Sequence, residues 1–288
     1  MIIVSLGGGL ANQMYQYTFY NWLKNKSPHK VYLDKSLYEH RVPKQNTDPI
    51  HSGYELENVF NIQGDYAGLR DIYRLSEYRY DIVRKVISKI KGRPHSQLSS
   101  DNTDNRVTYD NIDVNKDEMY YEGTFGDPRY FFDYESDIRK KFTFPDFATD
   151  ANRETADKIR SCESVSIHVR RGDYLNIGQN GSAVLKMEYY SKAISYFEDR
   201  FDNVIFFVFS DDPKWCRDNF KGDNFVVVDW NSGHDAYRDM QLMSMCRHNI
   251  IANSTFSKWA ARLNVNIGRV IIEPEKMNDI KVIEDKRW

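Results

Sequence analysis

The stretch SIHVRRGDYL, residues 166–175, places a histidine and two adjacent arginines where an apolar run ends. A planar guanidinium donates two parallel hydrogen bonds, a geometry that suits phosphate oxygens. If the strand persists to Arg170, alternation puts that side chain on the face that carries His168 and puts Arg171 on the other face. We expect Arg170 to face a phosphorylated ligand and Arg171 to anchor the loop against a carboxylate; a solvated turn is the simpler alternative.

Two further apolar runs end in polar clusters. One ends in Asp211 and Asp212, whose carboxylates could accept hydrogen bonds from a base or a ribose. The other leads into Ser and Thr at 254–257, at the start of an expected helix, where free N–H groups attract anions. Ligands of parallel sheets bind beyond the carboxyl ends of the strands. No metal-ligand pattern accompanies these residues, so the sequence predicts a nucleotide-diphosphate site that works without a metal.

Strands and helices alternate along the chain, which is typical of parallel α/β folds. A strand, a glycine loop, a helix and a second strand are expected within the first 35 residues. After residue 160 the pattern predicts strands at 164–169, 203–212, 224–229, 250–254 and 269–274, with helices at 186–201, 235–249 and 256–264. Two doubly wound domains follow, with a linker between 145 and 162.

The glycine loop at 7–9 matches neither standard phosphate-binding fingerprint. Asn12 stands where the dinucleotide motif has its third glycine, and no Gly-Lys-Ser/Thr follows. A tight turn that lets strand and helix pack is the simpler interpretation of these glycines.

Composition excludes several classes of function. The net charge of −2 gives no electrostatic reason to expect nucleic-acid binding. The three cysteines form neither a metal pattern nor a disulfide framework, which favours a reducing compartment. The N-terminal apolar run is too short for a signal peptide, and no run is long enough to span a membrane. We expect a cytoplasmic protein.

A basic segment interrupts this pattern. Residues 70–93 read as an amphipathic helix with eight Lys or Arg against three acidic residues. Such a helix could lie on the anionic inner face of a membrane. A solvated helix face is the alternative.

Five blocks are similar, in order and spacing, to the α-1,2-fucosyltransferases of glycosyltransferase family 11. They are GGGLANQMYQY, EGTFGDPRYF, SIHVRRGDYL, VFSDDPKWC and DMQLMSMCRHNIIANSTFSKWAARL. The resemblance implies an α/β fold of GT-B type, in which two Rossmann-like domains face a central cleft. Residues 1–155 would form the acceptor-side domain, and 156–288 the domain that binds GDP-fucose.

The resemblance also implies a reaction and partners. Fucose would pass from GDP-fucose, the donor substrate, to O2 of a terminal galactose with inversion and without a metal or other cofactor. The acceptor would be a galactose-terminated oligosaccharide or a lipid-linked glycan. Arg170 would stabilise the charge that develops on the leaving β-phosphate. An acceptor hydroxyl must lose a proton, and Asp173 is the nearest candidate base, although a structural role in the turn is an equal alternative.

Site residues follow from the matching blocks. The donor-binding residues would be His168, Arg170, Asp211, Asp212, Asn253, Ser254, Thr255 and Ser257. The glycine loop on the acceptor side would contribute Gly8, Gly9, Asn12 and Gln13.

The chain departs from the family pattern at two places. Ala11 stands where glycine is usual, which would restrict the glycine loop. Lys258 replaces the first of two usual tryptophans, and Ala260 replaces a glycine after Trp259. These departures bear on local geometry and on acceptor choice more than on the reaction.

Two alternatives stay open. The enzyme could form another fucosyl linkage or use another class of acceptor. More remotely, the Arg-Gly-Asp tripeptide at 171–173 could mark a non-enzymatic adhesion protein. The absence of a secretion signal and the buried strand before the tripeptide argue against adhesion.

Overall fold

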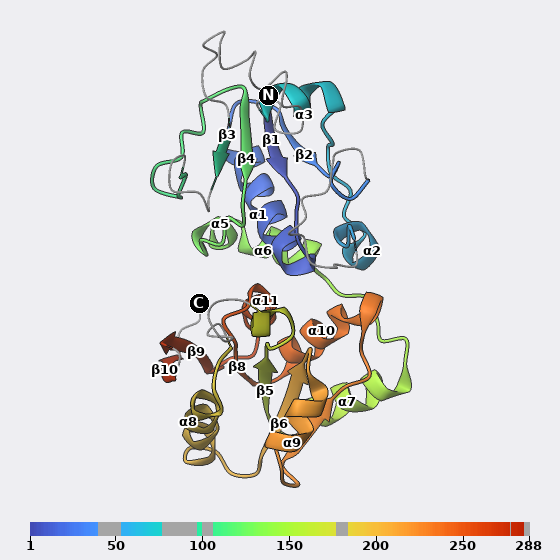
Figure 1. Ribbon diagram of the computed structural model, residues 1–288, viewed down its shortest axis with the longest axis vertical. Coiled ribbons are helices and arrows are strands. Elements are labelled where there is room, and N and C mark those ends of the chain that lie inside the picture. The colour runs from blue at the N-terminus through green and yellow to red at the C-terminus, as the bar shows by residue number, and fades with distance from the viewer. Residues whose placement is uncertain (40–52, 77–96, 100–105, 177–183, 277, 285–288) are drawn as a thin grey trace. The chain divides into compact units, whose positions relative to one another are not determined.

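The structure is a computed structural model that describes residues 1–39, 53–76, 97–99, 106–176, 184–276 and 278–284. The chain divides into two compact units, Met1–Thr143 and Phe144–Trp288 (Figure 1). Each unit contains its own sheet, as the alternating pattern predicted.

The division between the units lies earlier than the predicted boundary at 155/156. That boundary falls inside helix α7 (Asp150–Ser161), which belongs to the second unit. The reason is a pair of polar contacts: Asn152 accepts a hydrogen bond from the Trp230 indole at 2.8 Å and donates one to Asn231 at 2.8 Å. These contacts tie α7 to the loop after a strand of the second sheet.

The first unit has a parallel sheet of strand order β2-β1-β4-β3. Its strands are β1 (Ile2–Ser5), β2 (Val31–Asp34), β3 (Gln97–Ser99) and β4 (Met119–Glu122). Its helices are α1 (Leu10–Lys26), α2 (Leu56–Phe60), α3 (Leu69–Leu75), α5 (Arg129–Phe132) and α6 (Glu135–Lys141). The predicted strand, glycine loop, helix and strand are confirmed as β1, α1 and β2.

The second unit has a six-stranded sheet of order β10-β9-β8-β5-β6-β7. Its strands are β5 (Glu163–Val169), β6 (Val204–Ser210), β7 (Phe225–Val228), β8 (His248–Ile250), β9 (Ile271–Lys276) and β10 (Asp279–Ile283). Its other helices are α8 (Met187–Glu198), α9 (Pro213–Asn219), α10 (Tyr237–Met245), α11 (Thr255–Leu263) and the 3-10 turns η1 (Asp173–Asn176) and η3 (Gly233–Asp235). Strand β10 runs antiparallel to β9 and was not predicted.

One predicted strand and one predicted helix are displaced along the sequence. The strand expected at 250–254 is β8, which begins at His248, and the helix expected over 235–249 ends at Met245. The cause is pairing: His248 and Asn249 lie opposite β5, so they belong to the ladder, whereas Ser254 caps the next helix.

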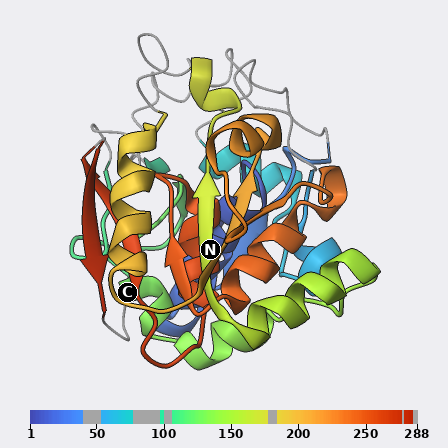
Figure 2. The same ribbon diagram turned by 90° about the horizontal axis from the view of Figure 1, so that it is seen from below.

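Both faces of β5 are buried, and alternation is confirmed by what its side chains contact. Val165, Ile167 and Val169 lie in the core that packs against α8 and α9. Ser166 lies on the other face, where its hydroxyl accepts a hydrogen bond from the Asn249 amide at 2.8 Å. Figure 2 shows helices on both sides of this sheet.

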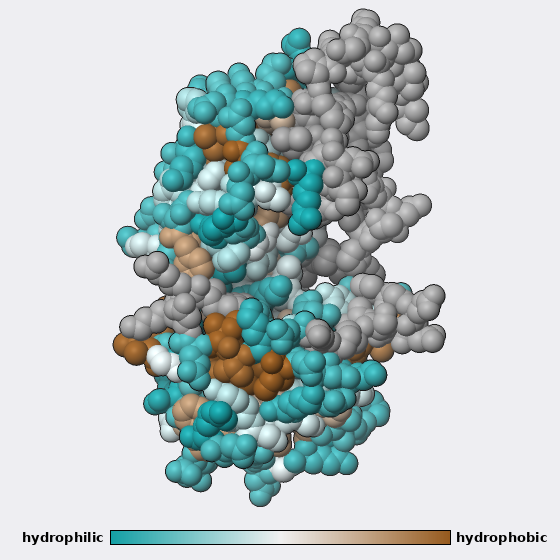
Figure 3. Space-filling view, turned by 90° about the vertical axis from the view of Figure 1, so that its left-hand side faces the viewer, coloured by the Kyte–Doolittle hydropathy of each residue, from teal (hydrophilic) through white to brown (hydrophobic). Residues whose placement is uncertain are grey.

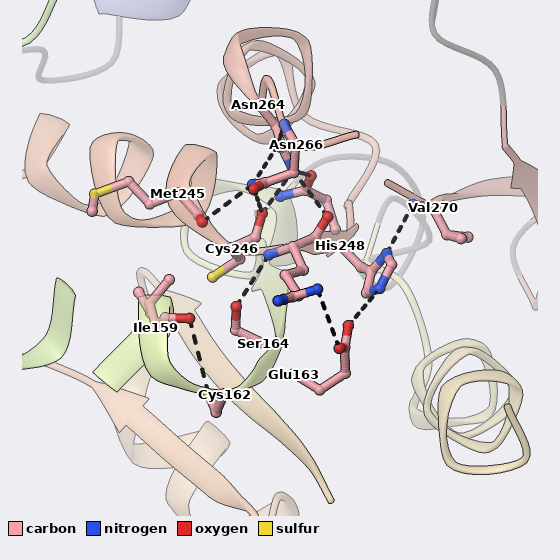
Figure 4. A network of polar contacts seen from close by, with 12 residues as sticks. Ile159, Cys162, Glu163, Ser164, Met245, Cys246, His248, Asn264, Asn266 and Val270 are labelled. Atoms are coloured by element: carbon pink, nitrogen blue, oxygen red, sulfur yellow. Dashed lines mark hydrogen bonds and ion pairs between the residues drawn. The ribbon is translucent and has the colours of Figure 1, made fainter. Parts of the chain in front are cut away.

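A polar network fastens the amino ends of β5 and β8 (Figure 4). The Arg247 N–H donates to the Ser164 hydroxyl at 3.1 Å, and His248 is bonded to Glu163 at 2.8 Å. The Asn264 amide donates to the Cys246 carbonyl at 2.8 Å. The two central strands therefore hold a fixed register, which sets the positions of the residues that follow their carboxyl ends.

Hydrophilic residues prevail on the face shown in Figure 3, and hydrophobic residues gather in one area of the second unit. In the part of the chain that the structure describes, no helix combines the length and apolar character that a membrane crossing requires. Most of the basic segment 70–93 lies outside the described residues. Within its described part, Arg74 is ion-paired with Glu118 at 2.5 Å and with Asp71 at 3.5 Å.

Candidate active site

The strand order of the second sheet contains a topological switch point between β5 and β8. From β5 the chain continues outward through β6 and β7, and then returns to the other side of β5 to form β8 and β9. Ligands of open α/β sheets bind beyond the carboxyl ends of the strands at such a point. The polar residues after β5, β6 and β8 therefore lie where the fold favours a ligand.

Arg170 follows directly after β5, whose last strand residue is Val169. Strand alternation therefore does not extend to Arg170, contrary to the premise of the sequence argument. Ion pairs orient its guanidinium instead: one nitrogen lies 2.8 Å from Asp173 and another 2.9 Å from Asp211. The guanidinium also lies 5.5 Å from the centre of the Tyr174 ring.

Arg171 anchors the loop, as predicted. Its backbone N–H donates to Asp211 at 2.9 Å, and its side chain donates to Asp212 at 3.1 Å. Its guanidinium also lies 4.4 Å from the centre of the Trp215 ring. The two arginines thus have different surroundings, although they are neighbours in sequence.

Asp211 contacts both arginines, and Asp212 pairs with Arg171. Asp212 also accepts the Trp215 N–H at 3.1 Å, which caps α9. Partial burial raises the pKa of Asp212, but the bonds from Trp215 and Arg171 outweigh it, and the net pKa is lowered. The carboxylate is therefore charged at neutral pH.

Gly172 is required by the approach of Asp211 to the loop. A Cβ at this position would lie 2.6 Å from one carboxylate oxygen of Asp211, well inside van der Waals contact. A larger residue would displace the carboxylate that contacts Arg170 and the Arg171 N–H.

His168 is buried at the end of β5, and its ring centre lies 5.7 Å from that of Phe256. Burial, followed by the charge of Arg170, lowers the pKa of His168 to about 3, so the imidazole is neutral at physiological pH. Its Nδ1 is buried and has no hydrogen-bond partner among the described residues. A neutral imidazole can either donate or accept a hydrogen bond, which suits a ligand group.

The residues after β8 complete this edge of the sheet. The Asn253 carbonyl accepts a hydrogen bond from the Tyr174 hydroxyl at 3.1 Å, which joins the loops after β5 and β8. The Ser254 hydroxyl accepts from the Phe256 N–H at 3.3 Å and so caps α11, whose first residue is Thr255.

Ser257 does not face outward, as a residue that contacts the donor substrate would. It is fully buried, and its hydroxyl is bonded to the Ala252 N–H at 3.2 Å and to the Ser254 carbonyl at 3.4 Å. Ser257 is the third residue of α11, and its side chain bonds to backbone groups of the turn before the helix. We therefore assign Ser257 to holding the turn before α11.

The glycine loop of the first unit is built around two side chains of α1. Gly8 has a φ of +75°, and a Cβ there would lie 2.5 Å from the Asn12 amide nitrogen. Gly9 is the N-cap of α1, and its carbonyl accepts the Asn12 N–H at 3.0 Å. Asn12 is partly exposed beside the loop, and its role on the acceptor side stays a prediction.

Gln13 is buried and holds the loop, although the sequence analysis expected it on the acceptor side. It is fully buried, and its amide donates to the carbonyls of Gly8 at 3.0 Å and Gly53 at 2.9 Å. Its carbonyl accepts the Glu55 N–H at 2.9 Å. The side chain therefore ties the glycine loop to the segment before α2.

The departures from the family pattern lie inside helices. Ala11 is buried in the first turn of α1, where alanine is the best helix former, so it does not restrict the glycine loop. Trp259 and Ala260 are buried in α11, and Lys258 is partly exposed on it.

A half-buried carboxyl group that the sequence argument missed lies in α10. Asp239 accepts a hydrogen bond from the Asn231 amide at 2.8 Å, and Asn231 in turn contacts Asn152. Burial raises the pKa of Asp239 to about 7, although the Asn231 bond opposes the rise. Asp239 stands directly before Met240, a core residue, and an acidic residue beside a core position was the signal available in the sequence.

Within the described ranges, the structure contains no group of three or more His, Cys, Asp or Glu side chains arranged to hold a metal ion. The chain's independence of a metal stays a prediction.

Known proteins resemble both the sequence and the fold. The family model for Glycosyl transferase family 11 matches residues 99–286 of this chain. An Alpha-1,2-colitosyltransferase of Escherichia coli is 30% identical over 305 residues, covering 99% of this chain and 97% of that protein. A Galactoside alpha-(1,2)-fucosyltransferase 1 of Saimiri boliviensis boliviensis is 30% identical over 145 residues, covering 46% of this chain and 40% of that protein.

Among solved structures, the fucosyltransferase NodZ from Bradyrhizobium matches with a TM-score of 0.55 at 16% identity, covering 98% of each chain. A NodZ alpha-1,6-fucosyltransferase soaked with GDP-fucose matches with a TM-score of 0.54 at 14% identity, covering 99% of this chain and 98% of that one. Together with the two parallel sheets, this likeness confirms the predicted GT-B type of α/β fold. The extent of the family match and the full-length relative show that this chain belongs to glycosyl transferase family 11.

Proposed function

We propose that this chain transfers L-fucose from GDP-fucose to O2 of a terminal galactose, with inversion at C1 and without a metal ion. The observation that carries the proposal is the position of Arg170 at the switch point of the second sheet, where it pairs with Asp211 of the loop after β6 and lies beside Tyr174, which bonds to the loop after β8. Family membership and two relatives named as α-1,2 transferases support the class of reaction.

The proposed chemistry follows from charge. When the bond between C1 and the β-phosphate oxygen breaks, the electron pair stays on that oxygen, and the Arg170 guanidinium stabilises it. The acceptor O2 forms the new bond to C1 from the opposite face and loses its proton to a base. Asp173 is the candidate base, and its present ion pair with Arg170 places it at the same arginine. The neutral His168, Asn253, Ser254 and Thr255 would contact the nucleotide.

The domain roles remain part of the proposal. The second unit would bind the GDP moiety, because it contains the arginine and the helix N-terminus of α11. The first unit would contribute Gly8, Gly9 and Asn12 on the acceptor side. A galactose-terminated oligosaccharide or a lipid-linked glycan would be the acceptor.

A donor and acceptor panel tests the reaction. Purified protein is incubated with GDP-L-fucose or GDP-colitose and with β-galactosides, and the linkage of each product is determined. Colitose is L-fucose without its 3-hydroxyl group, so the comparison of the two donors tests whether the protein contacts that hydroxyl. Transfer to galactose O2 from GDP-fucose is expected. Faster transfer from GDP-colitose would assign the sugar of the full-length relative, and another linkage would refute the acceptor position while leaving the family intact.

Metal independence has its own test. Because an arginine supplies the positive charge at the pyrophosphate, we expect transfer to survive excess EDTA with most of its rate. A divalent ion could still accelerate turnover modestly by promoting GDP release. Complete loss of activity in EDTA, restored by one specific metal, would contradict the proposal.

The adhesion alternative conflicts with the surroundings of the tripeptide at 171–173. The Arg171 side chain is only 19% exposed and is paired with Asp212. Asp173 is paired with Arg170. A recognition tripeptide needs its two charged ends available, and here both are engaged within the second unit.

We propose a cytoplasmic enzyme that contacts the inner face of the membrane through residues 70–93. Binding of the protein to vesicles of anionic and of neutral lipid, measured by sedimentation, tests this contact. Equal sedimentation with both kinds of vesicle would refute an electrostatic contact.

A further inference from the structure

One cation and two carboxylates form the centre of the proposed donor site. Arg170 contacts Asp173 at 2.8 Å and Asp211 at 2.9 Å. The three side chains together carry one net negative charge. A pyrophosphate, itself anionic, would have to reach the same guanidinium, where it competes with the two carboxylates for the N–H donors and is repelled by their charge.

The two carboxylates are held very differently. Asp211 accepts the Arg171 N–H at 2.9 Å and lies against the Cα of Gly172, so it is fixed from two further sides. Asp173 begins the short turn η1, and its Oδ1 lies 2.8 Å from an Arg170 nitrogen; this oxygen is buried and accepts no other hydrogen bond among the described residues. Asp173 can therefore rotate away at smaller cost than Asp211.

We propose that Asp173 is an internal competitor for the donor: its carboxylate takes the part of the Arg170 guanidinium at which the pyrophosphate binds. This inference rests on the proposed function. Donor binding displaces Asp173, and Asp211 stays to orient Arg170. The displaced carboxylate is then free to accept a hydrogen bond from the acceptor hydroxyl, which links the candidate base to the presence of the donor.

Removing the charge of Asp173 should therefore strengthen binding of the nucleotide. We expect Asp173→Asn to bind GDP about fivefold more tightly than the wild type in calorimetry, because a half-buried ion pair of this kind contributes at the upper end of the range for surface pairs. Inorganic pyrophosphate should show the same gain, and guanosine, which has no phosphate, should show none. Turnover should fall in the same variant, since the candidate base is lost.

Matched variants separate this effect from other causes. Asp173→Glu keeps the carboxylate and should bind GDP as the wild type does. Asp157→Asn removes another i,i+3 ion pair, with Arg160 at 2.9 Å, and controls for net charge. Asp211→Asn should weaken GDP binding, because Arg170 loses its fixed partner. If Asp173→Asn does not fold, as judged by its melting temperature, Asp173→Ser replaces it.

Several results would overturn the inference. Unchanged or weaker GDP binding by the neutral variants would do so, as would an equal gain with guanosine or in Asp157→Asn. In each of these cases the wild type still binds GDP, and the proposed function stands. Failure of the wild type to bind GDP would instead reject the proposed donor, and the inference with it.

Discussion

Replacing Arg170 by lysine is expected to lower turnover about a hundredfold or more while the protein stays folded. Lysine keeps the positive charge but loses the planar fork that contacts two groups at once. The loss of one preorganised contact to the charge that develops in the transition state costs about 3–4 kcal/mol. Turnover with GDP-fucose and the melting temperature are measured for the same preparation.

Arg171→Lys is the matched control for this prediction. Its guanidinium contacts Asp212 and Trp215, and both contacts hold the loop. We expect a lower melting temperature and a much smaller loss of turnover. The reverse pattern, in which Arg170→Lys keeps most of its activity and Arg171→Lys loses it without destabilisation, would contradict the assignment of the two arginines.

The second large effect is expected at Asp239, where Asp239→Asn should stabilise the protein at neutral and higher pH. The folded protein holds this proton up to pH about 7, whereas the unfolded chain releases it near 3.8. Folding therefore loses stability as pH rises from about 4 to about 7, and asparagine removes that loss. A shift of this size corresponds to about 2–4 kcal/mol, and the lower figure allows for partial exposure.

Denaturant unfolding of wild type and Asp239→Asn from pH 4 to pH 8 measures the effect. The gain should be near zero at pH 4, grow through the window and level off above pH 7. His168 contributes the opposite slope, because its folded pKa of about 3 lies below the unfolded value of 6.5. It is present in both proteins and cancels in the comparison. A gain that is constant with pH would show that the carboxyl of Asp239 is not the source.

Sequence patterns predicted the elements that bring the candidate site together. The strands β5, β6 and β8 end at Val169, Ser210 and Ile250; polar residues follow the first two directly and begin at Asn253 after the third. Parallel strands place their carboxyl ends at one edge of the sheet. For this reason His168, Arg170 and Asp211 could be grouped from the sequence, although they come from separate segments.

Local sequence could not predict which polar side chains face outward. Gln13 and Ser257 stand in blocks that resemble ligand-binding motifs, yet both are buried and bonded to backbone groups. The burial of a helical side chain depends on what packs against that turn. For the same reason, the sequence did not predict the raised pKa of Asp239, which arises from burial in the folded unit.

By itself, the sequence determined the two α/β domains, the edge of the sheet at which the candidate site lies, and the arginine pair after β5. Periodicity and strand ends are properties of short segments, so they can be read without a partner. The tertiary structure alone decided what each arginine contacts. Strand alternation stops at Val169, and beyond it Arg170 and Arg171 are oriented by Asp211 and Asp212, forty positions further along the chain.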